Sequence, residues 1–192
     1  MSNKGLVVSS ILSGALVVMA AFSGPAIGDH GHGGNQQSPL KQHAGELVQA
    51  VRDATRRFRD VNQAEAEGYH LLFGCVSGPD DGAMGLHYVN MDLVIDPALD
   101  PRRPEIVIYE PLPNGGRRLI GADFLVFAEA WHANNTGTPE LGGQLMHLIE
   151  SPNRYGLPAF YTLHVWAWKP NPTGAFVNWH SDVSCEQFGG QQ

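Results

Sequence analysis

The chain has 192 residues, of which 43% are hydrophobic and 16% are charged, a composition that suits one globular domain with a hydrophobic core. Its 23 glycines and 13 prolines predict many turns and few long helices. The net charge of −7, with only two short basic clusters at residues 56–59 and 117–118, argues against a nucleic acid as partner.

The first 28 residues have the layout of a secretory signal peptide. Lys4 supplies a positive charge, residues 5–22 form an uncharged apolar run, and small residues at 24–28 offer a cleavage site. We therefore expect cleavage, export to the periplasm or the cell exterior, and no stable membrane insertion afterwards. The alternative is an uncleaved anchor, because about 18 apolar residues approach the length that spans a bilayer.

Residues 29–39 are polar and rich in glycine, which predicts a flexible tail ahead of a single globular domain at residues 40–192. His30 and His32 lie in this tail, and together with a free amine they could bind copper or zinc weakly. We favour a solvated tail instead, because a flexible segment loses conformational entropy when it closes around an ion.

The segment 40–67 carries the strongest helix prediction. Its apolar residues recur at alternating spacings of four and three, which places them on one face of a helix. These residues are Leu40, Ala44, Leu47, Val51, Ala54, Phe58 and Val61. Ser38 and Pro39 are typical of a helix start, and Gly68 is typical of a helix end. We expect this long amphipathic helix to pack on a sheet, with a homodimer through the helix as the alternative use of its apolar face.

Beyond Gly74 the pattern changes to short apolar runs between turns that are rich in glycine and proline. Residues 75–85 predict a loop. The apolar runs predict strands at residues 86–95, 105–111, 117–127, 144–149 and 159–169. One helix followed by five or six strands in hairpin order predicts an α+β fold, with the helix packed on an antiparallel sheet or a partial barrel.

Cys75 and Cys185 are the only cysteines. In an exported protein such a pair predicts a disulfide, which here would close a loop of 110 residues. Two unpaired buried thiols are the alternative. A metal site at these cysteines is disfavoured, because neither of them belongs to a CxxC pair.

Three stretches carry a family resemblance: "GAMGLHYVN", "SPNRYGLPAFYTLHVWAWKPNP" and "VSC". They resemble a family of exported bacterial proteins without an established activity, and the likeness spans about residues 55–185. The resemblance implies export and a single domain, and it assigns no functional residue. The chain contains no HExxH, GxSxG or GxGxxG motif, which disfavours the enzyme classes that carry them and leaves open whether the protein is an enzyme.

The candidate metal ligands are three histidines and one carboxylate on predicted strands with mostly apolar neighbours: His87, Glu110, His147 and His164. Neutral imidazoles on rigid strands, balanced by a carboxylate, suit zinc, copper or iron. Several ionisable groups buried together also need a common partner that compensates for their lost contact with water. We therefore predict one transition-metal site from these residues, and we expect His164 to point into a cavity that it shares with His87.

Each of these residues has a simpler alternative. A core histidine can be hydrogen-bonded to a carbonyl, and Glu110 can reach solvent or an arginine. Trp166 and Trp168 share a face of the last predicted strand, and if exposed they would make a non-catalytic binding module for a sugar ring or a hydrophobic partner. We favour a buried core for them. Glycosidase chemistry is disfavoured, because Glu105 and Glu110 would lie on opposite faces of one strand.

Overall fold

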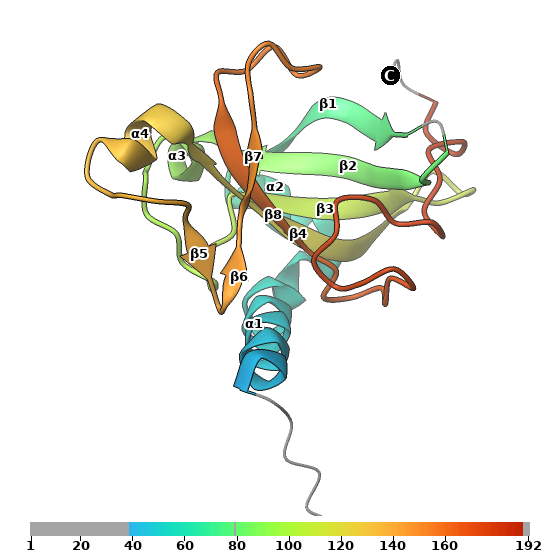
Figure 1. Cartoon of the computed structure of the whole chain (residues 1–192). Coiled ribbons are helices and arrows are strands. Elements are labelled where there is room, and N and C mark those ends of the chain that lie inside the picture. Colours follow the sequence, from blue (N-terminus) through green and yellow to red (C-terminus); the bar gives the residue numbers. More distant parts are fainter. Residues whose placement is uncertain (1–38, 79, 190–192) are drawn as a thin grey trace, which may run out of the picture. The chain divides into compact units, whose positions relative to one another are not determined.

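The structure is a computed structural model that describes residues 39–78 and 80–189. The predicted signal peptide and most of the predicted tail, with His30 and His32, lie outside the described residues. The described chain has an antiparallel sheet of six strands, one longer helix at its start and several short helices (Figure 1). This arrangement confirms the predicted α+β class.

The six strands follow one another in the sheet in the order β1-β2-β3-β4-β8-β7. Their bounds are β1 Tyr69–Ser77, β2 Ala83–Asn90, β3 Ile106–Pro111, β4 Arg117–Phe127, β7 His147–Ile149 and β8 Phe160–Val165. All neighbouring strands are antiparallel. The last strand, β8, lies between β4 and β7 and is therefore covered on both edges. A separate ribbon pairs β5 (Glu140–Leu141) with β6 (Gln144–Leu145).

The helix predicted at 40–67 is divided into three pieces. They are α1 (Pro39–Thr55), a 3₁₀ turn (Arg56–Arg59) and α2 (Val61–Ala66). Asp60 interrupts the helix, because its backbone is extended and its side chain accepts the amide hydrogen of Asn62 as the N-cap of α2. The turn buries Phe58, whose carbonyl oxygen accepts the hydroxyl hydrogen of Tyr109. The prediction of one continuous helix is thus corrected by a local cap.

Other boundaries also differ from the predicted ones. The strand predicted at 86–95 ends at Asn90, whose side chain accepts two backbone amide hydrogens and begins α3 (Met91–Val94). The strand predicted at 144–149 is divided between β6 and β7. A short helix, α4 (Ala128–His132), lies between the strands predicted at 117–127 and 144–149, where the sequence analysis assigns no helix.

The strand β1 is not predicted by the sequence pattern. Phe73 and Gly74 both have a positive φ, and the pairing with β2 shifts register between Leu72 and Cys75. This irregularity breaks the alternation by which a strand is recognised. The sequence analysis assigns no element to residues 69–74 and a loop to residues 75–85, whereas β1 runs to Ser77 and forms an edge of the sheet, and β2 begins at Ala83.

The two faces of the sheet carry different chemistry. On one face, here called the helix face, α1 packs Leu47 and Val51 against alternate residues of β4 and β8. These partners are Ala122, Phe124, Val126, Tyr161, Leu163 and Val165. The intervening residues of the same strands point to the opposite face, here called the site face, and include Asp123, Thr162 and His164. The helix thus covers one face of these strands, and Asp123, Thr162 and His164 lie on the other among apolar neighbours such as Leu125 and Phe160.

A disulfide joins Cys75 in β1 to Cys185 near the C-terminal end of the described chain. It confirms the predicted bond and ties the C-terminal segment to an edge strand. Such a bond is consistent with the oxidising location of an exported protein. Between residues 39 and 189, as far as they are described, no helix has the length and apolar character needed to cross a bilayer.

Removal of the disulfide should destabilise the fold. We expect the double variant Cys75→Ala/Cys185→Ala to lose about 2–5 kcal/mol of unfolding free energy, because the unfolded chain regains the freedom of a long closed loop. Urea denaturation of the oxidised wild-type protein and of the variant measures this difference. Equal midpoints for the two proteins would contradict a stabilising role for the bond.

Glu105 is a buried carboxyl just before β3, and its exposed fraction is 1%. One of its oxygens accepts the backbone amide hydrogen of Leu125 at 3.1 Å. Burial raises the pKa of Glu105 to about 8, although hydrogen bonds from its own backbone and from Leu125 oppose the shift. The folded protein therefore keeps this carboxyl protonated at neutral pH.

The raised pKa of Glu105 makes the stability of the folded protein depend on pH. An unfolded Glu105 ionises near its ordinary pKa of 4.5 whereas the folded one stays neutral up to about 8, so its contribution to stability falls as pH rises between these values. The variant Glu105→Gln cannot ionise, so it avoids this loss of stability. Its side-chain oxygen can still accept the backbone amide hydrogen of Leu125. We expect the variant to gain about 1–3 kcal/mol over wild type between about pH 5 and pH 8 in urea unfolding. A difference that stays constant over this range would show that Glu105 ionises normally.

Candidate metal centre

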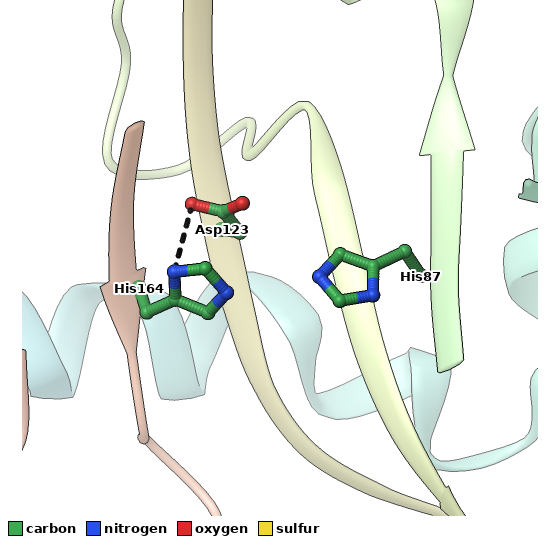
Figure 2. Close-up of side chains that lie close together, drawn as sticks. All are labelled: His87, Asp123 and His164. Atoms are coloured by element: carbon green, nitrogen blue, oxygen red, sulfur yellow. Dashed lines mark ion pairs between the residues drawn. The ribbon is translucent and has the colours of Figure 1, made fainter. Parts of the chain in front are cut away.

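Three buried polar side chains converge on the site face: His87 from β2, Asp123 from β4 and His164 from β8 (Figure 2). Each of them offers one nitrogen or oxygen atom, and these atoms all lie within 4.8 Å of one another. Asp123 stands directly opposite His164 in the pairing of β4 with β8. His87 reaches the pair from across β3, where Ile108 is its paired neighbour. The antiparallel sheet thus brings together residues that are far apart in the sequence.

The three side chains are hidden from solvent, with exposed fractions of 6% for His87, 4% for Asp123 and 2% for His164. The two imidazole rings point toward one another, and the carboxylate lies beside the gap between them (Figure 2). The ring centroids are 5.9 Å apart. These positions confirm the prediction that His164 faces a cavity shared with His87 rather than open solvent.

A cavity of about 50 Å³ adjoins the three groups. Its polar lining consists of these groups together with Thr162 and Asn178, and the rest of its lining is apolar or aromatic. The apolar part includes Phe73, Leu125, Tyr155, Leu157 and Phe160. Walls of this kind limit access of water and strengthen electrostatic interactions inside the cavity.

The ring of His87 is oriented by the backbone of its own strand. Its Nδ1 lies 3.1 Å from the carbonyl oxygen of Gly85. Because a carbonyl oxygen only accepts, we assign the proton to Nδ1, which leaves the lone pair of Nε2 directed toward His164 (Figure 2). Gly85 has a φ of 94°, and a Cβ there would lie 2.5 Å from the carbonyl oxygen of Tyr109. Glycine is therefore required at the position that orients the imidazole.

The carboxylate of Asp123 is oriented by Thr162, whose hydroxyl donates to Oδ1 at 2.6 Å. The same oxygen lies 3.6 Å from Nδ1 of His164, which is too long for a hydrogen bond. Both ring nitrogens of His164 are buried, and neither has a partner at full hydrogen-bond distance and angle among the residues that the structure describes, although the side chain of Asn178 lies near enough to act on the ring. Buried polar atoms without a well-placed partner are exceptions in folded proteins, so the ring nitrogens of His164 favour a bound ligand.

Burial keeps both imidazoles neutral at neutral pH. It lowers the pKa of His164 to about 3, and the nearby His147 acts in the same direction, whereas the side chain of Asn178 opposes the shift. It lowers the pKa of His87 to about 4, where His164 adds to the effect and Asp123 opposes it. Burial also raises the pKa of Asp123 to about 6, against the hydrogen bond from Thr162. Near pH 7 the site thus offers two neutral imidazoles and one carboxylate.

This donor set is one that zinc, iron and copper accept in proteins. Bonds of about 2.0–2.1 Å to a tetrahedral ion place the donor atoms about 3.3 Å apart. The spread of 4.8 Å must therefore contract by about 1–2 Å around an ion, and side chains that border a cavity can rotate to do so. The buried group of His87, Asp123 and His164 could thus hold a metal ion, with the cavity on its open side.

Glu110 is a predicted ligand that the structure places elsewhere. One of its carboxylate oxygens binds Arg118, and the other accepts a hydrogen from Lys169 at 2.6 Å. It lies four residues along β3 from Ile106, the residue opposite Asp123, which corresponds to about 13 Å along a strand. Its partners fit the alternative in which this carboxylate reaches an arginine.

His147 is the other predicted ligand outside the group of three. It stands opposite Thr162 in the pairing of β7 with β8, which sets it on the site face beyond the edge of the cavity. Its side chain is exposed, yet it is near enough to lower the pKa of His164. The geometry does not bring His147 to the same point as the other three side chains, and its role as a ligand stays a prediction.

Asp123 is the member of the group that the sequence analysis missed. It lies within "LIGADFLVF", where a single carboxylate interrupts an apolar strand. That isolation is the signal that could have found it, because a charge inside a buried strand needs a partner. Its neighbour across the sheet, however, depends on the strand register, which the local pattern does not contain.

The aromatic side chains of β8 and the residues that follow it are largely buried. Trp166 has an exposed fraction of 3%, and its ring centroid lies 5.7 Å from that of His164 and 5.0 Å from that of His180. Trp168 is half-buried, and its indole N–H donates to the hydroxyl of Thr55. Among the described residues, the exposed large hydrophobic side chains do not include a tryptophan. Trp166 and Trp168 are therefore largely covered, and they offer little exposed aromatic surface to a binding partner.

No family model matches the chain, and no curated protein or solved structure is significantly similar to it. The resemblance carried by "GAMGLHYVN" and the other two stretches stays a prediction. The candidate site is defined by the geometry and the chemistry of its own side chains.

Asp123→Asn should stabilise the metal-free protein at neutral pH. The substitution removes a buried negative charge and keeps an oxygen that accepts the hydroxyl hydrogen of Thr162. The pKa of Asp123 is higher in the folded protein than in the unfolded chain, so the carboxyl costs stability as pH rises from about 4 to about 6.

We therefore expect the chelated variant to be about 1–2 kcal/mol more stable than chelated wild type near pH 7.5, and to gain nothing near pH 4. Urea unfolding at the two pH values measures both differences. A metal-free variant that is less stable than wild type near pH 7.5 would mean that the hydrogen bonds to the carboxylate, such as the one from Thr162, outweigh the cost of burying its charge.

Proposed function

We propose that this exported protein binds one transition-metal ion through His87, Asp123 and His164, with one side of the ion facing the cavity. The observation that carries the proposal is His164, because both of its ring nitrogens are buried and neither meets full hydrogen-bond geometry in the described part of the chain, where Asn178 is the one nearby side chain that acts on the ring besides the other members of the cluster and His147. One of these nitrogens would bind the ion, together with Nε2 of His87 and the carboxylate of Asp123.

A bound cation accounts for the cluster better than hydrogen bonding alone. A neutral imidazole needs an acceptor for its N–H and a donor or cation for its other nitrogen, and the carboxylate of Asp123 can only accept. A protonated His164 would pair with Asp123, but burial favours the neutral ring. A cation bound to all three groups compensates the buried carboxylate and the lone pairs of both rings at once.

The donor set narrows the identity of the metal. Two imidazoles with one carboxylate suit zinc, iron or copper, whereas calcium and magnesium prefer donor sets made of oxygen. Three protein ligands also leave at least one position for water or another small ligand. The function supported best is therefore metal handling, or a metal-dependent reaction at that position.

Export is part of the proposal. The signal-like pattern of residues 1–28 and the disulfide between Cys75 and Cys185 support it. The protein would then hold its metal in the periplasm or outside the cell. A homodimer through the helix, and a set of partners that excludes nucleic acid, stay predictions.

His164→Ala should lower the bound metal to near zero while the fold survives. Mature protein is stripped with a chelator, reloaded with Zn²⁺ and desalted, and the zinc content is measured by elemental analysis, with circular dichroism as the check of the fold. We expect one zinc per chain in wild type. His70→Ala is the matched control, because it removes an exposed histidine of β1 and should keep the full equivalent.

The opposite outcome would identify a hydrogen-bonded core. In that case His164→Ala would leave the zinc content unchanged and cost about 1–3 kcal/mol of stability. His147→Ala and Glu110→Gln examine the two predicted ligands outside the group. A site of three protein ligands requires that both of these variants keep one zinc per chain.

A further inference from the structure

The cavity beside the three ligands has an aromatic wall toward the surface. Phe73 and Tyr155 line this cavity, and they also line a second hollow outside it, which Arg154 borders. The rings of Phe73 and Tyr155 meet edge to face, with their centroids 5.6 Å apart. These two side chains therefore separate the cavity from the outer hollow.

Phe73 holds its position with an unfavourable backbone. Its φ is 64°, in the left-handed region that residues with a Cβ rarely adopt, and it lies in the irregular part of β1. Its side chain is 44% exposed although it lines the cavity. Strained residues that are held by the surrounding structure gather at binding sites, and here the strain places an aromatic ring at the mouth of the cavity.

The size of the cavity limits what it can admit. A water molecule needs about 10–15 Å³ of such volume, so about 50 Å³ holds only a few waters. This space fits a ligand of two or three heavy atoms bound to the ion. A ligand that contains a ring exceeds it.

The charges around the cavity favour an anion. A divalent ion with the Asp123 carboxylate and two neutral imidazoles has a net charge of about +1 between largely apolar walls. Outside, the Arg154 guanidinium donates to the carbonyl oxygen of Ser77 at 3.1 Å and lies 5.9 Å from the centre of the Tyr155 ring. It places a second positive charge on the outer side of the aromatic wall. Asn178 lines the cavity as well and adds a neutral polar side chain to its wall.

We infer that the open side of the metal site binds a small monovalent anion of two or three heavy atoms, which enters between Phe73 and Tyr155. This inference rests on the proposed metal site and adds the class of its exogenous ligand. The anion replaces a metal-bound water, so one metal–oxygen bond breaks, one bond to the anion forms, and no electron is transferred.

Cobalt(II) and azide provide the direct test. Metal-free protein is loaded with Co²⁺, the cobalt content is measured, and azide is then added while the visible ligand-field spectrum is recorded. We expect a saturable spectral change that corresponds to one azide per cobalt. Benzoate has the same charge and a bulky ring, and we expect no spectral change from it over the same concentrations.

Three variants locate the ligand and its route. Leu157→Phe fills the cavity from a half-buried wall position and should abolish azide binding while cobalt stays bound. Phe73→Ala opens the wall, so azide should bind about threefold faster or more, and benzoate should gain access. Arg154→Gln should slow azide binding about two- to fivefold at low salt and have no effect at high salt. The control Arg102→Gln changes an exposed arginine at a different hollow and should leave the rate unchanged.

The possible outcomes distinguish a failure of the anion inference from a failure of the proposed metal site. Protein that binds no cobalt overturns both. Cobalt that binds without any spectral response to azide overturns this inference alone. Equal responses of wild type to azide and to benzoate contradict the size limit, and unchanged azide rates in both Phe73→Ala and Arg154→Gln contradict the proposed route.

Discussion

In the pairing of β4 with β8, Asp123 stands opposite His164, and both side chains project from the site face. The rest of the site depends on this register. A slip of either strand by one residue would turn its own polar side chain toward Leu47 and Val51 of α1, on the helix face, and separate it from its partner. The alternate apolar residues that α1 covers, such as Phe124 and Leu163, would lose this burial if a strand slipped, so they also hold the polar residues between them on the opposite face. The hydrophobic core thus positions the candidate metal ligands.

Much of the fold follows from periodicity and composition, and short polar side chains account for several of the differences. The amphipathic segment, the antiparallel strands and the disulfide are all expected from the spacing of residue types. Asp60 and Asn90 then interrupt a helix and end a strand, because their side chains accept backbone amide hydrogens. Such caps act locally, and they compete with a pattern that extends over many residues. The strand β1 is missed for a different reason, since the left-handed backbone at Phe73 and Gly74 breaks its alternation.

Only part of the candidate site can be predicted from the sequence. Alternation places His164 among the aromatic residues of a buried strand, and a cavity shared with another histidine is a reasonable expectation. Asp123 and Glu110 look alike by the same criterion, because each is a carboxylate in an apolar strand. The register separates them: Asp123 faces His164, whereas Glu110 lies between Arg118 and Lys169. Pairing between distant strands is not contained in a local pattern, so residue type and spacing alone could not choose between the two carboxylates.

A buried carboxylate beside two neutral imidazoles costs stability in a fold that needs only an apolar core, and a bound cation offsets that cost. The most direct measurement of this account is anomalous diffraction from crystals of the mature protein grown with Zn²⁺ and recorded on both sides of the zinc absorption edge. The account predicts one strong zinc peak within bonding distance of His87, Asp123 and His164. Zinc peaks only at exposed histidines such as His70 and His147, with none between the three buried side chains, would contradict it.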